Sequence, residues 1–365
     1  MNDSSPPPTI ALFEYYKDFY RRHRQEIILV GILLALFLGI ILMGRLMAAV
    51  IVAVILAYLL EGPVSFIEKR RVSRWLAVLA VYFVFVISLL ATFFALVPVL
   101  IAQTGTLLSD LPDYVRGAEE FLEKLPEEYP DYVDEATIAQ LLQNIRSYQN
   151  ELTNRFFGIM LSILRHGFTF IIYMVLVPLM VFFFIKDKDK ILSWLSGFLP
   201  KERTLAQKVW GDTNRQIANF IRGKFWEVLI VGTVATIAFL LLGLDFAILF
   251  GVLTGLSVLI PYIGATVVTF PIALVAWFQF GMGPDFIYVL SAYLIIQILD
   301  GNVLFPLLFS RVVHLHPLAI LVALIFFGGI WGFWGLFFAI PLATLINAVI
   351  SSWPRKSDLA LEPPK

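Results

Sequence analysis

Residues 246–280 read FAILFGVLTGLSVLIPYIGATVVTFPIALVAWFQF, and residues 317–350 read PLAILVALIFFGGIWGFWGLFFAIPLATLINAVI. Both stretches are almost wholly apolar, and glycine and proline interrupt each of them. A transmembrane helix needs about 20 apolar residues. Each stretch is therefore too long for one span, and the first is too short for two. The two stretches predict helices that are broken within a lipid bilayer.

The composition of the whole chain supports a membrane location. Of its 365 residues, 59% are hydrophobic and 15% are charged, and the mean hydropathy is +0.85. A soluble domain has about a quarter of its residues charged. The chain contains no cysteine, which excludes disulfides and thiolate chemistry. We therefore predict an all-α polytopic membrane protein that is not an enzyme, with the lipid bilayer as a partner and with no metal site, cofactor or bound nucleic acid.

Six further apolar runs are long enough to cross the bilayer. The first two are separated only by Gly44-Arg45, so we expect a tight helical hairpin with its turn at that pair. The predicted full spans are Ile27–Met43, Leu46–Leu60, Trp75–Pro98, Phe156–Ile185, Trp226–Leu242 and Phe286–Phe309.

The distribution of charge predicts the orientation. Lysine and arginine are enriched in short cytoplasmic loops. The loop 61–74 and the helical segment 186–224 are basic and are assigned to the cytoplasm, whereas the acidic segment 101–155 is assigned to the outside. This alternation places both termini, residues 1–26 and 351–365, in the cytoplasm. Prolines 112, 126 and 130 are expected to divide the acidic segment into short amphipathic helices with a solvated surface; a ligand-capturing cap is the alternative.

The two broken stretches resemble each other. Residues 244–249 match residues 316–321, Gly264 corresponds to Gly335, and residues 270–274 match residues 340–344. Each stretch follows one intact span, and the predicted topology gives the two units opposite polarity. Such inverted repeats are typical of secondary transporters. We assign residues 225–350 to a transport domain and the spans within 27–100 and 156–185 to a scaffold; chance similarity between apolar segments is the alternative.

Asp300 is the main candidate for a functional residue, because it lies in the middle of an apolar span. A carboxylate at that depth costs several kcal/mol unless it is paired, protonated or hydrated. Gln297 shares its helical face, and Asn302 lies beside it. The group predicts a binding site for a proton, a cation or a substrate; a structural hydrogen bond to a neighbouring helix is the alternative. Glu227 is interpreted as part of an ion pair at the membrane interface.

Several short motifs resemble the AI-2E (autoinducer-2 exporter) family. The motifs are AYLLEGP at 57–63, PLMVFFF at 178–184 before KDKD, NFIRGK at 219–224, LIPYIG at 259–264, DGNVLFP at 300–306, LHPL at 315–318 and the closing run 328–341. The resemblance covers about residues 10–354.

The resemblance implies a transporter of the bacterial inner membrane. Family members are proposed to export the signal AI-2 or to exchange sodium for protons, and homo-oligomers with elevator-type motion are implied. The resemblance also assigns binding roles to residues of the two broken stretches: Pro261, Tyr262, Gly264, Gly328, Gly329 and Pro341. Asp300 and Asn302 stand where the family commonly has an acid–Asn pair; the acid is often Glu, so the reach of the shorter Asp differs.

These observations predict a secondary transporter that exports a small polar solute or signalling molecule and is coupled to an ion gradient. A sodium/proton antiporter is one alternative. Another is a non-transporting membrane scaffold for envelope machinery, which would act through residues 101–150 or 186–224. A membrane enzyme is the weakest alternative, because only Gln297, Asp300 and Asn302 offer polar groups at one depth.

Overall fold

The computed structural model describes residues 24–128, 134, 136–144, 147, 158, 167–197, 204–309 and 316–351. All regular structure within these residues is helical, and six helices are long and apolar enough to cross a membrane, which confirms the predicted all-α polytopic class. The main elements are α2 (Arg24–Glu68), α3 (Arg74–Glu128), α5 (Gly167–Lys186), α6 (Lys188–Ser196), α7 (Thr204–Leu241), α8 (Ala247–Ser257), α9 (Ile263–Phe280), α10 (Pro284–Leu299), α11 (Phe305–Phe309) and α12 (Pro317–Ser351).

The predicted hairpin turn at Gly44-Arg45 is wrong. Helix α2 runs without interruption from Arg24 to Glu68, a length of 45 residues. A Gly-Arg pair contains no proline, and arginine favours helical backbone, so the hydrogen-bond ladder continues through it. The helix is about 67 Å long at the usual rise per residue, which exceeds the thickness of the hydrocarbon core. The prediction of a cytoplasmic N-terminus assumed two membrane crossings in this part of the chain. The location of the N-terminus stays a prediction.

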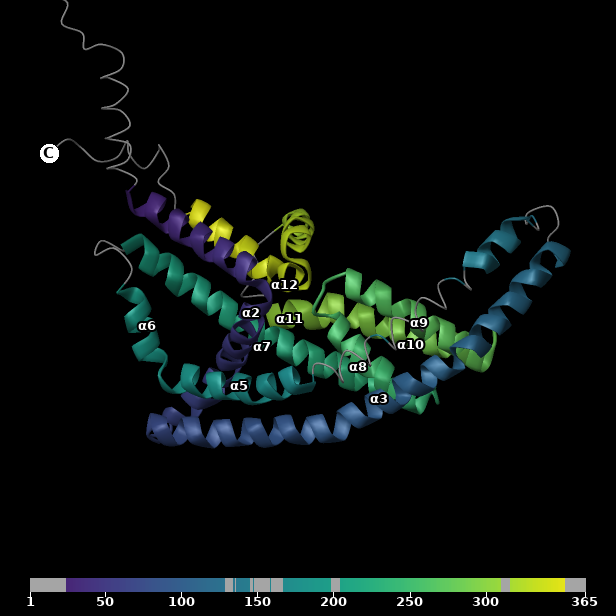
Figure 1. Cartoon of the computed structure of the whole chain (residues 1–365), viewed down its shortest axis with the longest axis horizontal. Helices are drawn as coiled ribbons and strands as arrows, with labels where there is room; N and C mark the ends of the chain where they lie inside the picture. The colour runs from purple at the N-terminus through teal and green to yellow at the C-terminus, as the bar shows by residue number, and fades with distance from the viewer. Residues whose placement is uncertain are drawn as a thin grey trace, which may run out of the picture. The chain divides into compact units, whose positions relative to one another are not determined.

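The third predicted span does not end near Pro98. Helix α3 extends over 55 residues and passes through Pro98, Pro112 and Pro126 (Figure 1). The expected division of residues 101–128 into short helices is therefore wrong; Pro130 lies outside the described residues. A proline removes one backbone hydrogen bond and kinks a helix, but the helix persists where its neighbours keep their bonds. The predicted fourth span covers Phe156–Ile185. Most of the part that precedes α5, residues 156–166, also lies outside the described residues.

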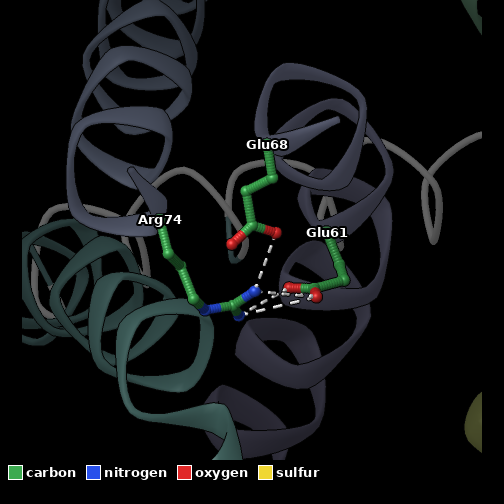
Figure 2. Close-up of polar contacts among 3 residues, drawn as sticks. All are labelled: Glu61, Glu68 and Arg74. Carbon is green, nitrogen blue, oxygen red and sulfur yellow. Dashed lines mark hydrogen bonds and ion pairs between the residues drawn. The ribbon is translucent and has the colours of Figure 1, made fainter. Parts of the chain in front are cut away.

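The corner between α2 and α3 is fixed by an ion-pair cluster (Figure 2). The guanidinium of Arg74 bridges two carboxylates of α2, with Nη2 lying 3.3 Å from Glu61 and Nη1 lying 3.1 Å from Glu68. The connecting loop contains Arg71 in the left-handed backbone region, with φ 67°. The planar fork of arginine allows one side chain to hold both acids.

The chain forms two compact units, of which one comprises residues 59–182 and 222–310. Its core lies between α7, α8, α9 and α10, and α3 packs against α8 and α9. Helices α7 and α8 approach closely where Gly255 faces Gly232, since a Cβ on Gly255 would lie 2.7 Å from the Val228 carbonyl oxygen. Small residues at such crossings let helix backbones pack tightly in membranes.

The first broken stretch forms a helical hairpin in this unit. Helix α8 ends at Ser257, α9 begins at Ile263, and Tyr262 in the turn has φ 65°. A Cβ on Gly264 would lie 2.6 Å from the carbonyl carbon of Ser257 and would overlap its oxygen. Glycine at 264 therefore lets α9 begin directly against the end of α8.

The second broken stretch, in the other unit (residues 1–58, 183–221 and 311–365), also folds back. The backbone of Gly332 is non-helical, with φ 58° and ψ −133°, and α12 continues in two arms (Figure 1). A Cβ on Gly335 would lie 2.5 Å from the carbonyl carbon of Phe327. In a straight helix these residues would be about 12 Å apart. Gly335 thus has the same role as Gly264, as the sequence match predicts, while the opposite polarity of the units stays a prediction.

Candidate functional site

The span that carries Asp300 changes its helical geometry at that residue. Helix α10 ends at Leu299, residues Asp300–Leu304 form a π-helical turn, and α11 follows. The N–H of Phe305 donates to the carbonyl of Asp300, five residues earlier. Insertions of this kind are rare and occur frequently at functional sites.

Three polar side chains share one face of this span, because Tyr293, Gln297 and Asp300 are spaced by four and three residues. Tyr293 is almost fully buried, and its hydroxyl donates to the carbonyl of Ala265 on α9 at 2.6 Å. The Gln297 Nε2 and Asp300 Oδ1 atoms are buried and make no hydrogen bond of normal geometry among the described residues, although the Gln297 amide interacts more loosely with the Tyr293 hydroxyl. Buried polar groups normally have partners, so this pair marks a position for a ligand, an ion or water.

Asn302 does not join this face. It is exposed, and its Nδ2 donates to the carbonyl of Ile298 at 2.9 Å. In this structure Asn302 therefore stabilises the π-helical turn rather than facing the same space as Asp300.

Helix α7 contributes a buried ion pair. The Lys224 Nζ lies 2.7 Å from Oε2 of Glu227, and their side chains are only 3% and 2% exposed. The same ammonium donates to the carbonyl oxygen of Val258 at 2.7 Å. Val258 follows the last residue of α8, where helix carbonyls lack partners within the helix. Lys224 thereby provides a hydrogen-bond donor for one carbonyl group at the C-terminal end of α8.

Asp300 belongs to the same electrostatic cluster, because its carboxylate interacts with both Lys224 and Glu227. The cluster holds one ammonium and two carboxylates, so one negative charge is in excess when all three are ionised. Helix α7 supplies Lys224 and Glu227, the π-helical turn after α10 supplies Asp300, and the surrounding core is apolar.

Of the predicted hairpin residues, three lie at the turn of the first hairpin. Pro261 is half-buried, Tyr262 is 63% exposed, and Gly264 is buried against Ser257. The turn begins at Val258, the residue whose carbonyl accepts from Lys224. Lys224 thus links this turn, through its hydrogen bond to Val258, with Asp300, through electrostatic attraction; the binding roles of Pro261, Tyr262 and Gly264 stay predictions.

The other three predicted residues belong to the second hairpin. Gly328 lies against the side chain of Leu336 on the opposite arm, Gly329 is exposed with open space around it, and Pro341 is buried. Their relation to Asp300 stays a prediction.

The described structure is therefore a helical membrane protein with broken helices and a charged cluster inside an apolar bundle. A family model described as AI-2E family transporter matches residues 30–355. The chain belongs to the AI-2E transporter family. It is 45% identical over 346 residues to the protein named "Putative permease PerM" of Escherichia coli K12, covering 94% of this chain and 98% of that protein. It is also 28% identical over 304 residues to "Putative transport protein YueF" of Bacillus subtilis, covering 80% of each.

In this AI-2E family member, the predicted ion pair of Glu227 is present: its partner is Lys224, and both side chains are buried within the protein. The predicted position of this pair at the membrane interface stays a prediction. Both residues lie inside α7, which continues from the basic segment into the predicted span without a break. The available signal was the i, i+3 spacing of a lysine and a glutamate that are followed only by apolar helix. Tyr293 was also missed, because one tyrosine in an aromatic-rich span gives no distinct pattern.

Proposed function

We propose that the protein is a secondary transporter that moves a small polar solute past the first hairpin and the polar face of α10. The observation that carries the proposal is the buried ion pair of Lys224 and Glu227 at the end of a broken helix, with the partly buried Asp300 coupled to it. Burying an ion pair costs several kcal/mol per ion before its attraction is counted, and apolar residues would pack as stably. Charged residues inside membrane helices are rare and typically line pathways for ions or substrates.

The unsatisfied groups supply the binding chemistry. Asp300 Oδ1 offers an acceptor, or a donor when protonated, and Gln297 Nε2 offers a donor. A polar solute that hydrogen-bonds to both would compensate for their burial. Asp300 would exchange a proton or a cation during each cycle, which couples solute movement to an ion gradient. Export, elevator-type motion and a homo-oligomeric assembly are parts of this proposal that follow from the family resemblance.

A non-transporting scaffold is the second candidate, and the length of α3 favours it. The distal part of this helix continues past the apolar stretch to Glu128 and exposes acidic residues such as Asp113, Glu120 and Glu123. This surface could hold an envelope protein. The two candidates differ in whether purified protein alone moves solutes.

The test is a flux screen in proteoliposomes containing the purified full-length chain. A panel of radiolabelled small polar solutes, including AI-2, would be tested with imposed proton or sodium gradients. Asp300→Asn is expected to abolish gradient-driven transport while leaving folding intact. The matched control is Asp285→Asn, because Asp285 is an exposed acid in the first turn of the same helix.

Undiminished transport by Asp300→Asn would reject its role as the coupling group. Absence of flux for every solute, together with loss of partner capture when residues 101–128 are removed from the chain, would favour the scaffold.

A further inference from the structure

The surroundings of the Lys224 ammonium are those of a bound cation. An ammonium has three N–H donors. Two oxygens lie 2.7 Å from Nζ: the carbonyl oxygen of Val258 and Oε2 of Glu227. The rings of Phe305 and Phe309 lie 5.7 and 5.3 Å from it, within the range of cation–π attraction. A backbone carbonyl at a helix end, a carboxylate and two aromatic rings therefore enclose the charge.

The two oxygens are ligands that an alkali-metal ion would use. In transporters with discontinuous helices, unwound carbonyls and the C-terminal ends of half-helices coordinate sodium. Val258 lies at such an end, because it follows the last residue of α8. The negative end of the helix dipole further favours a positive charge here.

We propose that Lys224 takes the place of a coupling sodium ion: the ammonium group of this α7 side chain occupies the site, so that sodium does not bind there. The inference deepens the proposed function, since it implies that transport through the first hairpin does not require sodium. Its direct consequence concerns ion binding alone and can be measured without a known solute.

The ion pair is packed inside the protein. Lys224 is 2% and Glu227 is 1% exposed. The neighbouring Gly223 lies so close to Phe309 that an added Cβ would be 2.6 Å from the ring. The ring of Phe309 thus packs against the backbone of α7 next to the ammonium.

Removal of the ammonium would reverse the preference of the site. Truncation of Lys224 to alanine leaves the carboxylate of Glu227 and the carbonyl of Val258 without the ammonium that contacts both, and leaves Asp300 without its electrostatic partner. A buried carboxylate, a free carbonyl and a second carboxylate that is coupled to the first would attract a small cation from solution. Lys224→Ala is therefore expected to create a sodium site that the wild-type protein lacks.

The experiment uses the purified full-length chain in detergent. Thermal unfolding is followed in sodium chloride and in choline chloride at equal ionic strength, and equilibrium binding of ²²Na⁺ is measured in parallel. The wild-type protein should show no sodium-specific rise in Tm and no saturable ²²Na⁺ binding that Glu227→Gln abolishes. Lys224→Ala should show both. The control Lys224→Ala/Glu227→Gln removes the ligand carboxylate and should show neither.

Saturable ²²Na⁺ binding by the wild-type protein, abolished by Glu227→Gln, would overturn the proposal. So would a folded Lys224→Ala protein whose Tm is the same in both salts. If folded Lys224→Ala protein can be purified in sodium chloride but not in choline chloride, the proposal is supported. If Lys224→Ala fails to fold in both salts while the double variant folds, the proposal is overturned. These outcomes do not depend on flux, so loss of the proposed transport function would be recognised separately.

Discussion

The two hairpins can be tested by adding one methyl group at a glycine near the start of each second arm. Gly264→Ala would place Cβ 2.6 Å from the carbonyl carbon of Ser257, and Gly335→Ala would place it 2.5 Å from that of Phe327. Each oxygen would be overlapped outright. Carbon atoms not bonded to each other pack at about 3.5–4.0 Å, so backbone on both arms would have to separate by about 1 Å.

The expected destabilisation follows from two opposing effects. Alanine in place of glycine in a helix stabilises by about 0.5–1 kcal/mol. Overpacking a tight contact typically costs about 1–3 kcal/mol and sometimes more, and here the clash is with backbone, which cannot rotate away. We expect each variant to lose about 2–3 kcal/mol, with a Tm lower by on the order of 5 °C.

The assay is thermal unfolding of purified protein in detergent, followed by tryptophan fluorescence. Gly329→Ala is the matched control, because Gly329 lies in the same helix as Gly335 and has no heavy atom within 4 Å of an added Cβ. That variant should be as stable as the wild type or slightly more stable. Equal stability of Gly264→Ala, Gly335→Ala and Gly329→Ala would refute the folded-back arrangement of both segments.

Two further predictions concern the charged clusters. Lys224→Met should lower the free energy of unfolding by about 3–5 kcal/mol, because it leaves the buried carboxylate of Glu227 without a positively charged partner. The double variant Lys224→Met/Glu227→Gln should recover most of that loss. Equal stability of the single and the double variant would show that the two side chains do not form a buried ion pair. Arg74→Gln should lower the free energy of unfolding by about 1–2 kcal/mol, because the partly buried Glu61 loses a charged partner. Arg116→Gln breaks an exposed ion pair and should change the free energy of unfolding by less than about 0.5 kcal/mol. Equal effects of the two substitutions in denaturation curves would show that the ion pairs of Arg74 do not stabilise the protein.

The sequence predicts the apolar helices and both hairpins because their signals are local. A long apolar run indicates a span, and glycine with proline inside it indicates a break. The correspondence between Gly264 and Gly335 also follows from sequence. Each glycine lies where the two arms of its own hairpin come together, and only a residue without Cβ fits there. Asp300 stands out for the same reason, as a lone charge in apolar sequence.

The errors come from features that neighbouring structure decides. Gly44-Arg45 is a weak helix breaker, and the helical hydrogen-bond ladder passes through it. Pro112 and Pro126 bend α3 at most, because a water-exposed helix can solvate the carbonyl that each proline leaves free. The burial of Lys224 could not be read from its sequence, because it depends on Val258, which is 34 residues away and accepts its hydrogen bond.

The proposed route through the membrane along the polar face of α10 is tested most directly by solvent accessibility. The chain contains no cysteine, so Gln297→Cys provides a single reactive thiol. A membrane-impermeant thiosulfonate reagent would be applied to right-side-out and to inverted membrane vesicles. Alternating access predicts that Gln297→Cys reacts from both sides, while Ile272→Cys, at a fully buried position of α9, does not react. Protection of Gln297→Cys from both sides would show that this face is a packed structural core and would contradict the account.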